Sequence, residues 1–475
     1  MKKIKTLHNN LKSFFFKSKG NKLDTSNSVI KEYLKTKSKD RLCFAPVKNL
    51  FFGINGTISS CYAQSFVLSY GKFPENTITQ AWNSKTATNI RAQVENLFLP
   101  PACNLCYRQV LEKNFNVTYA NVYDQHQSNA NFPVSMEFYL DNTCNLECIM
   151  CSPENSSLIA KHNGIFKNES PYNESFLNEL KHFIPHLKHT FFFGGEPFLI
   201  PIYYDIWEQI IKINPECSID ITTNGTVLNQ KVKTVLESGQ FNINISIDSL
   251  QKERFESIRK NSIFEKVMHN LEYFHDYCKR KNSNFYISFC PMQQNWEEIP
   301  DIVHFANKLN VGLIFNRVWS PSKCAIWSLN PEKIFDIYKY LDKFTITADS
   351  DIQHFNILGY NTLKSQIYIW HHDALRFADN LKEVKMHNLL ELIESELYNC
   401  FHSNKKNLLS IVKTKEQLLT RFLLINSIID NCKFSEQEMK TFYSNIKMQK
   451  SYFINALFFA ENEERIEHII DLART

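Results

Sequence analysis

Three cysteines stand close together in Thr143-Cys144-Asn145-Leu146-Glu147-Cys148-Ile149-Met150-Cys151, at spacings of four and three residues. Three thiolates on one short loop can bind three irons of a four-iron cubane, which leaves the fourth iron open to a small chelating molecule. A zinc site or three unrelated buried thiols are the alternatives, because zinc takes paired cysteines or mixed Cys/His sets. Only His162 is near enough in sequence to complete a local zinc knuckle.

A second set of cysteines precedes the first and comprises Cys43, Cys61 and the pair Cys103-x-x-Cys106. Four thiolates can fully ligate one [4Fe–4S] cluster, or they can hold a tetrahedral zinc ion. A fully ligated cluster would transfer electrons, whereas a set with one ligand pointing elsewhere would leave an iron open to substrate. The spacing leaves both metals and both roles open.

From about residue 134 to 320, short apolar runs alternate with helical segments. We predict strands over Ser135–Leu140, His189–Phe193, Ser218–Thr222, Asn242–Ile247, Phe285–Phe289 and Gly312–Phe315. We predict helices around Phe176–Phe183, Tyr203–Ile213, Lys231–Ser238, Phe264–Tyr277 and Ile299–Leu309. Successive β-α units imply parallel strands with right-handed crossovers. Six units are fewer than the eight of a closed barrel, so we expect an α/β fold with a partial (β/α)6 TIM-like barrel.

The segments on either side of this region differ in pattern. Asn55-Gly56 between two apolar runs predicts a hairpin, and Ile78–Arg91 reads as one helix with Trp82 on its apolar side. No glycine or proline follows Gly359, which favours helices. Further helix signals are the capping-box spacings Thr414/Gln417 and Ser435/Glu438 and the apolar positions Leu418, Phe422, Leu423 and Ile425.

These patterns divide the chain into four parts. We expect a basic leader over 1–41 whose composition allows disorder, a small α+β metal-binding domain over 42–115, the partial barrel over 130–325 and an α-helical C-terminal domain over 330–475. The length of 475 residues, with 43% hydrophobic and 22% charged residues, is typical of a globular protein with two or three domains.

Composition also bears on location and partners. No apolar run is long enough to span a membrane, and the Lys-rich start lacks the apolar stretch of an export signal. We therefore expect a cytoplasmic chain without a membrane partner, whose 13 cysteines are reduced thiols or metal ligands. Residues 1–40 carry eleven Lys and three acidic residues, which we read as a solvated leader, and we do not expect a nucleic-acid partner.

Motifs in order along the barrel accompany the first cysteine set. Cys144-x-x-x-Cys148-x-Met150-Cys151 is followed by Gly194-Gly195-Glu196-Pro197, Thr222-Thr223-Asn224-Gly225 and Ser246-Ile247-Asp248-Ser249, with Arg259 and Pro291–Asn295 beyond them. Each motif lies at the end of a predicted strand, where the reactive face of such barrels is found. In this order, the series resembles the radical S-adenosylmethionine (SAM) superfamily.

The resemblance implies a cofactor and a reaction. Cys144, Cys148 and Cys151 would hold a [4Fe–4S] cluster that binds SAM. After one-electron reduction, by a partner such as flavodoxin or ferredoxin, SAM would be cleaved to a 5′-deoxyadenosyl radical that takes a hydrogen atom from the substrate. The resemblance also implies contacts to SAM, with the methionine amino group at the Gly-Gly-Glu-Pro motif and the ribose and carboxylate at the later residues. These contacts involve Met150, Gly194, Gly195, Glu196, Pro197, Asn224, Ser246, Asp248 and Arg259.

The second cysteine set has a family resemblance of its own. Cys43-Phe44-Ala45-Pro46, Asn55-Gly56, Cys61, Ala81-Trp82-Asn83-Ser84, Arg91 and Cys103-x-x-Cys106 together resemble the SPASM/twitch domain, which implies an auxiliary [4Fe–4S] cluster. This module usually follows the barrel, often has a doubled cysteine and has seven ligands in its larger form. Here it precedes the barrel, Tyr62 follows Cys61, and only four cysteines are available.

Because SPASM/twitch enzymes often act on peptides, our first hypothesis is oxidative modification or crosslinking of a peptide, as in the maturation of ribosomally made natural products. The alternative enzyme is one that modifies a small molecule, such as a sugar or cell-envelope precursor. A non-catalytic iron–sulfur or zinc scaffold is the alternative from another class, and the intact motifs argue against it.

Several other residues could contribute chemistry. Cys290 and Cys324 follow the fifth and sixth strands, where either could donate a hydrogen atom or ligate a metal; a buried apolar role is the commoner one for a free cysteine. We read His371 and His372 as surface residues at a helix start. Four further cysteines are expected to be structural, namely Cys217, Cys278, Cys400 and Cys432.

Overall fold

The structure is a computed structural model, which describes residues 23–37, 41–65, 69–98, 100, 103–111, 115, 118–124, 131–165, 170–319 and 321–382, and scattered positions from 424 to 470. Among these residues, no helix is both long and apolar enough to span a membrane. The outermost N-terminal part of the expected leader lies outside the described residues, as do Cys400, Cys432, Thr414 and most of the expected C-terminal domain.

Six parallel strands, from the edge strand β11 to β4, form one side of a nine-stranded sheet, whose order is β11-β10-β8-β7-β6-β4-β1-β2-β3. The six are β4 (Ser135–Phe138), β6 (His189–Phe192), β7 (Ser218–Thr223), β8 (Phe241–Ser246), β10 (Phe285–Phe289) and β11 (Gly312–Phe315). Neighbours pair in parallel throughout. Every predicted strand of the barrel region is present, so the predicted α/β partial barrel is confirmed.

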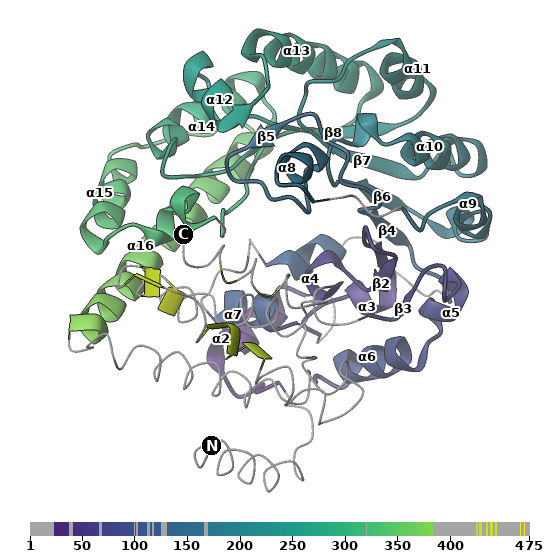
Figure 1. Cartoon of the computed structure of the whole chain (residues 1–475), viewed down its shortest axis with the longest axis horizontal. Helices are drawn as coiled ribbons and strands as arrows, with labels where there is room; N and C mark the ends of the chain where they lie inside the picture. Colours follow the sequence, from purple (N-terminus) through teal and green to yellow (C-terminus); the bar gives the residue numbers. More distant parts are fainter. Residues whose placement is uncertain are drawn as a thin grey trace, which may run out of the picture.

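Helices surround the outside of this curved sheet (Figure 1). They are α9 (Glu174–Leu180), α10 (Pro201–Ile213), α11 (Gln230–Ser238), α12 (Lys252–Ile258), α13 (Phe264–Lys281) and α14 (Ile299–Leu309), whereas α8 (Ser157–His162) lies inside their arc. Short 3-10 helices lie at η4 (Ile184–His186), η5 (Pro197–Leu199), η6 (Trp296–Glu298), η7 (Ser322–Cys324) and η8 (Ile326–Ser328). The five predicted barrel helices are confirmed, whereas α8 and α12 were not predicted.

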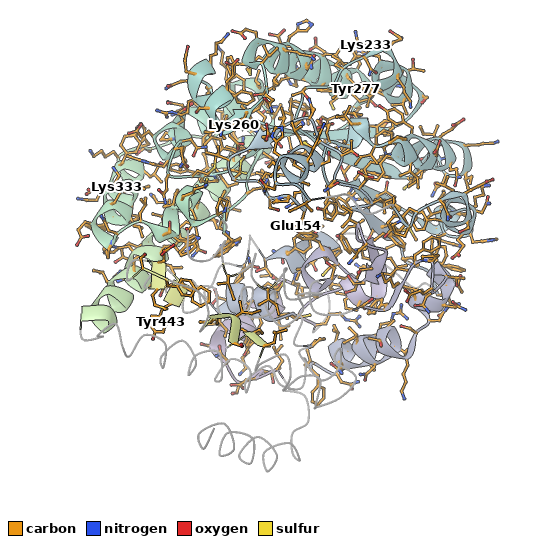
Figure 2. All side chains as sticks on the ribbon, in the orientation of Figure 1. Glu154, Lys233, Lys260, Tyr277, Lys333 and Tyr443 are labelled. Carbon is orange, nitrogen blue, oxygen red and sulfur yellow. The ribbon has the colours of Figure 1, made fainter. Side chains whose placement is uncertain are left out.

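Alternation along the strands separates an apolar outer face from a polar inner face. On β7, Ile219 and Ile221 are buried in the core beneath the helices, whereas Asp220 and Thr222 are only half-buried. On α10, the fully buried Trp207 packs edge-on against the ring of Phe192, with centroids 5.5 Å apart. Burying one such aromatic side chain contributes about 2–3 kcal/mol. Charged side chains lie on the outer rim, as Lys233 and Lys333 do in Figure 2.

The N-terminal segment contributes three strands to the same sheet: β1 (Asn49–Phe52), β2 (Thr57–Ser59) and β3 (Gly71–Lys72). The predicted hairpin is confirmed, since β1 and β2 pair antiparallel and Gly56 supplies the positive φ of 87° that the turn needs. β1 also pairs in parallel with β4, from Asn49 opposite Ser135 to Phe52 opposite Phe138. The sheet therefore runs without a break from the hairpin into the barrel, which the sequence did not predict.

Helices α2 (Ser28–Lys35), α3 (Ala45–Lys48), α4 (Tyr62–Ser65), α5 (Ile78–Trp82), α6 (Lys85–Glu95), α7 (Asn104–Leu111) and the 3-10 helix η3 (Tyr119–Tyr123) complete this segment. The prediction of one helix over Ile78–Arg91 is wrong. The chain forms two helices because Ser84 adopts an extended backbone and caps α6, accepting a hydrogen bond from the Ala87 N–H at 3.1 Å. Trp82 and Ile90 are nevertheless both buried.

Two helices follow the barrel, α15 (Pro331–Asp342) and α16 (Asp351–Lys382). Asn356 on α16 covers the edge of the sheet: its Oδ1 accepts from the Leu313 N–H at 2.6 Å and its Nδ2 donates to the Val311 carbonyl at 2.9 Å. His371 and His372 lie inside α16 and not at a helix start, so that prediction is wrong.

Farther along the chain, Ser435 and Glu438 form the predicted capping box, with reciprocal hydrogen bonds of 2.7 and 3.2 Å. Of the predicted apolar positions there, Ile425 is described and is fully buried. Cys217 and Cys278 are buried in the core, as expected for structural cysteines.

Candidate active site and auxiliary metal centre

The loop that carries the cysteine triad follows β4 and is held by backbone contacts. The Cys144 N–H donates to Ser157 Oγ at 3.1 Å, and the Cys151 N–H donates to the Cys148 carbonyl at 2.9 Å. Cys148 lies in the short strand β5 (Glu147–Cys148), which pairs antiparallel with β9 (Arg259–Lys260) and sets Cys148 opposite Arg259. This two-stranded ribbon fixes the middle of the loop.

The three thiols of the triad are half-buried. Burial raises the pKa of Cys148 to about 11 and that of Cys151 to about 12, and it raises the pKa of Cys144 as well. Thiols in such surroundings become thiolates when a bound cation compensates the charge. Asn224 Nδ2 lies 3.8 Å from Cys144 Sγ and can donate to it. Three half-buried thiols on one loop, with an amide donor beside Cys144, suit an iron–sulfur cluster.

Gly194 and Gly195 bring the end of β6 against this loop. Both have a positive φ, of 89° and 50°. A Cβ on Gly194 would lie 1.9 Å from Cδ2 of Tyr139, and one on Gly195 would lie 2.2 Å from the Thr143 carbonyl oxygen. The next residue, Glu196, donates its N–H to the same Thr143 carbonyl at 2.8 Å. Both positions must therefore be glycine for the end of β6 to pack against the cluster loop, whether or not a ligand also approaches them.

Glu196 is fully buried, and its carboxylate forms hydrogen bonds with other residues of the chain. Its carboxylate accepts hydrogen bonds from the Asn224 N–H at 2.7 Å, Thr223 Oγ1 at 2.8 Å and the Phe198 N–H at 3.2 Å. Burial raises the pKa of Glu196 to about 7, against the effect of these donors. Pro197, also buried, begins η5. The Glu196 side chain thus ties the end of β6 to the end of β7.

Asn224 connects β7 to the cluster loop. Its Nδ2 donates to Asn145 Oδ1 at 3.1 Å, and its Oδ1 accepts from Thr226 Oγ1 at 2.6 Å. Asn145 closes the set by donating to Thr226 Oγ1 at 2.9 Å. Through Asn145, which directly follows Cys144 in the chain, the end of β7 is held beside the triad.

Asp248 and Arg259 form an ion pair with side chains 0% and 7% exposed and a distance of 2.7 Å between Oδ2 and the nearer guanidinium nitrogen. Burial alone would lower the pKa of Arg259, but the Asp248 carboxylate raises it. Among the described residues, Arg259 Nε has no hydrogen-bond partner. A buried guanidinium with an unused donor fits an anionic ligand, such as the SAM carboxylate expected there.

The remaining predicted contacts lie on the same side of the barrel. Ser246 is the last residue of β8 and is half-buried on the inner face. Met150 is half-buried between two triad positions and packs against the core. The structure thus brings the strand-end motifs of β4, β6, β7 and β8 around one loop.

The four N-terminal cysteines are all buried. Burial raises the pKa of Cys43 and Cys61 well above the usual value, and the neighbouring thiols, including Cys103 and Cys106, add to the effect. The Ala45 N–H lies 3.3 Å from Cys43 Sγ and donates to it. Buried thiols that repel one another when ionised suit a metal centre, because a cation would relieve this repulsion.

Arg91 and Trp82 support this centre from α6 and α5. The guanidinium of Arg91 lies 3.7 Å from the Trp82 ring centroid, and its Nε donates to the Pro46 carbonyl at 2.9 Å. These contacts hold α3, which follows Cys43. Within the described part of the chain, no three His, Cys, Asp or Glu side chains converge on a point that a lone metal ion could fill.

Glu137 of β4 was missed by the sequence reasoning. This buried carboxylate accepts from the Tyr62 N–H at 3.2 Å, Asn49 Nδ2 at 2.9 Å, Tyr119 Oη at 3.3 Å and Tyr123 Oη. Burial raises the pKa of Glu137 to about 7. The signal in the sequence is a carboxylate inside the apolar strand run Ser135–Leu140, where a charged side chain needs buried partners.

Cys290 and Cys324 both lie near the triad. Cys324 Sγ donates to the Ile149 carbonyl of the cluster loop at 3.4 Å, and it is buried. Cys290 follows β10 and donates its N–H to Asp248 Oδ1 at 2.8 Å. Their chemical roles stay predictions.

Two family models match the chain, one over the N-terminal cysteines and one over the barrel. The SPASM model, described as an iron–sulfur cluster-binding domain, matches residues 43–107. The radical SAM superfamily model matches residues 139–306, which hold the triad and all strand-end motifs described above. The chain thus contains a region similar to the radical SAM superfamily, preceded by a region similar to the SPASM domain.

The chain is similar to curated proteins named GTP 3′,8-cyclase. It is 29% identical to that of Clostridium perfringens (strain SM101 / Type A) over 182 residues, or 37% of this chain and 52% of that protein. The identity to that of Clostridium botulinum (strain Okra / Type B1) is 22% over 338 residues, or 67% of this chain and 97% of that protein. The chain thus spans about half the length of the first of these relatives.

Among solved structures, the chain is similar to "Native anSMEcpe with bound AdoMet", at 20% identity over 44% of this chain and 59% of that chain, with a TM-score of 0.34. It is also similar to Streptococcus suis SuiB bound to precursor peptide SuiA, at 13% identity over 59% and 62% of the two chains, with a TM-score of 0.33. Similarity at this level says nothing about the substrate.

The match to an iron–sulfur domain favours a cluster over zinc at the N-terminal cysteines. The radical SAM match implies SAM and a SAM-binding [4Fe–4S] cluster, and the SPASM match implies an auxiliary iron–sulfur cluster. The match to the radical SAM superfamily argues against the alternative of a non-catalytic scaffold.

Proposed function

We propose that this chain is a radical SAM enzyme that oxidatively modifies or crosslinks a peptide. Cys144, Cys148 and Cys151 hold the SAM-binding cluster, and the strand-end residues from Gly194 to Arg259 hold SAM. When bound, these groups supply a 5′-deoxyadenosyl radical that takes a hydrogen atom from the substrate, and the auxiliary cluster offers a place for the electron that bond formation releases. The reaction takes place in the cytoplasm with a low-potential reductant such as flavodoxin or ferredoxin.

In this proposal, the auxiliary cluster binds at the N-terminal site through Cys43, Cys61, Cys103 and Cys106. Their four sulfurs would complete the coordination of one [4Fe–4S] cluster, which suits electron transfer better than substrate ligation. Glu137 and its tyrosine partners keep Tyr62, and with it the Cys61 segment, against the first strand of the barrel. The chain thus orients the auxiliary site toward the barrel without any contribution from the cluster itself.

The observation that carries the proposal is one group of aromatic rings between the two cysteine sets. Tyr62, which follows Cys61, lies 6.4 Å from Tyr139 and 5.8 Å from Phe193, measured between ring centroids. Phe193 precedes Gly194, and Tyr139 Oη donates to the carbonyl of Glu154 in the cluster loop at 2.9 Å. A substrate that loses a hydrogen atom at the SAM site and an electron to the auxiliary cluster must lie near both. The aromatic rings that join the two cysteine sets therefore support an oxidative reaction. Apolar aromatic walls also exclude water from a reactive radical.

The choice of a peptide rests on the SPASM match, whose family often acts on peptides. A small molecule is the second candidate, and the similarity to proteins named GTP 3′,8-cyclase favours it. The inner face of the barrel offers polar groups to either substrate, as the half-buried Asp220 and Thr222 do.

The test uses the full chain, purified without oxygen and loaded with iron and sulfide. The reduced enzyme is incubated with SAM and, in parallel, with a short peptide encoded beside its gene or with GTP. We expect 5′-deoxyadenosine to form and the peptide to lose two hydrogen atoms, which mass spectrometry detects. Conversion of GTP with the peptide unchanged would overturn the peptide proposal.

A matched pair of variants separates the two metal sites. Cys148→Ala should abolish formation of 5′-deoxyadenosine. Cys43→Ala should leave SAM cleavage in place but stop formation of the oxidised product. If Cys43→Ala gives the same product at the same yield, the auxiliary site does not take part in the oxidation.

A further inference from the structure

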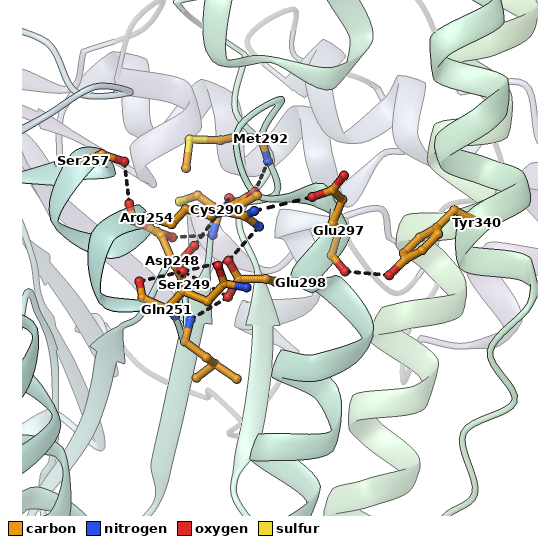
Figure 3. Close-up of polar contacts among 12 residues, drawn as sticks. Asp248, Ser249, Gln251, Arg254, Ser257, Cys290, Met292, Glu297, Glu298 and Tyr340 are labelled. Carbon is orange, nitrogen blue, oxygen red and sulfur yellow. Dashed lines mark hydrogen bonds and ion pairs between the residues drawn. The ribbon is translucent and has the colours of Figure 1, made fainter.

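Glu298 is a buried carboxylate at the N-terminus of α14 that the proposed mechanism does not use. It receives Ser249 Oγ at 2.7 Å, the Leu250 N–H at 2.7 Å and a guanidinium N–H of Arg254 at 2.9 Å. Figure 3 shows these donors gathered around it, all from the turn and helix that follow β8. Both oxygens of Glu298 are therefore committed to holding this turn.

Asn295, three residues earlier, holds the same turn from the other side. Its Nδ2 donates to the Asp248 carbonyl at 2.8 Å and to the Cys290 carbonyl at 2.9 Å, and its Oδ1 accepts from the Met292 N–H at 2.7 Å. The connection from β10 to α14 thus holds three consecutive residues, through the Asp248 carbonyl, the Ser249 hydroxyl and the Leu250 N–H.

The turn held by Glu298 and Asn295 contains Asp248, which forms the buried ion pair with Arg259 beside the triad. Asp248 Oδ1 accepts from the Cys290 N–H, and its Oδ2 faces the guanidinium of Arg259. Arg259 in turn lies opposite Cys148 in the β5–β9 ribbon. Two steps of direct contact therefore lead from the turn held by Glu298 to a cluster ligand.

We propose that Glu298 is a positioning residue of the SAM site: through the Asp248–Leu250 turn, it sets the direction of Asp248 and so presents Arg259 to SAM. Asn295 is its companion in this role. Glu298 contacts the strand-end motif of β8 at its last residue, Ser249, and acts on Asp248 through Ser249 and Leu250. The inference deepens the proposed function, since it rests on the proposal that Asp248 and Arg259 contact SAM.

The neighbouring Glu297 provides a matched control. It also reaches Arg254, at 3.4 Å, but its side chain is 56% exposed, whereas that of Glu298 is 3% exposed. Its backbone carbonyl accepts from Tyr340 Oη, a contact that a side-chain substitution retains. Glu297→Ala removes a carboxylate from the same arginine without releasing the turn.

The experiment measures the affinity for SAM itself on the cluster-loaded full chain, with the KM and kcat of uncoupled SAM cleavage and the electron paramagnetic resonance spectrum of the reduced cluster with and without SAM. Glu298→Ala should raise the Kd and KM for SAM about tenfold, as loss of groups that orient ligands typically does, with a smaller change in kcat. Iron content should be unchanged. Glu298→Gln keeps the shape and one acceptor oxygen and should restore part of the affinity, whereas Glu297→Ala should stay within about twofold of the wild type.

Three results would overturn the inference: an unchanged SAM affinity in folded Glu298→Ala, an equal loss in Glu297→Ala, or a fall in kcat without a rise in KM. If Glu298→Ala does not fold, folded Glu298→Gln decides by the same measure, and wild-type affinity in that variant overturns the inference. Failure of the proposed SAM contacts and failure of the positioning role give different results. A wild-type chain that does not bind SAM refutes the proposed SAM contacts, whereas equal binding by wild type and variants refutes only the positioning role.

Discussion

Substitution of Gly195 by alanine should disturb the cluster loop from outside it. Gly195 has a φ of 50°, a left-handed conformation that costs an alanine about 1 kcal/mol. The new Cβ would lie 2.2 Å from the Thr143 carbonyl oxygen and 2.7 Å from the Asn142 carbonyl carbon, where real Cβ atoms stay beyond 3.0 Å. The peptide before Cys144 must therefore shift by roughly 0.8 Å, and such overpacking costs about 1–3 kcal/mol more.

Gly164→Ala is the matched control for this substitution. Gly164 also has a positive φ, of 70°, but among the residues that the structure describes no heavy atom lies within 4 Å of its added Cβ. It should lose only the backbone contribution of about 1 kcal/mol. Guanidinium unfolding should thus separate the two variants by about 2 kcal/mol.

Cluster content gives the second measurement. Because the displaced peptide precedes Cys144, Gly195→Ala should also bind less iron and sulfide after anaerobic loading, whereas Gly164→Ala should load as the wild type does. Equal stability of the two variants, with full cluster content in both, would refute the argument that the Gly-Gly pair exists partly for contact with the loop.

Three further predictions concern other parts of the chain. Cys148→Ala should lose about half of the bound iron and all SAM cleavage, as iron counting and 5′-deoxyadenosine assays would show, because the N-terminal cysteines keep their own cluster. Glu137→Gln should flatten the pH dependence of stability: with the pKa of Glu137 raised to about 7 in the folded chain, its contribution is complete below pH about 4.5 and is lost as the pH rises through 7, by up to about 3 kcal/mol. Urea unfolding at several pH values checks this, and equal slopes in both proteins would contradict it. Asn356→Leu should cost about 2–3 kcal/mol and speed amide exchange at Leu313, because it leaves that N–H unpaired at the sheet edge; unchanged exchange would count against the cap.

Much of the barrel could be predicted because its signals are local. Parallel strands buried on one face read as short apolar runs, and the triad and Gly-Gly-Glu-Pro motif follow directly on two of them. The split of the helix over 78–91 was missed, although Ser84 is a good helix cap, because the apolar positions on both sides fit one helical period.

The contacts that shape the candidate site were less accessible to sequence reasoning, because they join distant segments. The β5–β9 ribbon pairs Cys148 with Arg259 through strands of two residues, too short to give a periodic signal. The hydrogen-bond donors to Glu137 are Tyr62, Tyr119 and Asn49, and no sequence pattern near β4 predicts them. Nor does any local pattern predict that β1 continues the barrel sheet.

The pairing of β1 with β4 has a consequence for the order in which the chain assembles. β1 is made early, but the strand that completes it emerges from the ribosome only some eighty residues later. Until then the N-terminal hairpin has one open edge, and its cysteines lack the Glu137 support that β4 brings. The auxiliary site should therefore mature after the first barrel strand is synthesised, so that metal insertion at both centres becomes a late and coupled event in biogenesis.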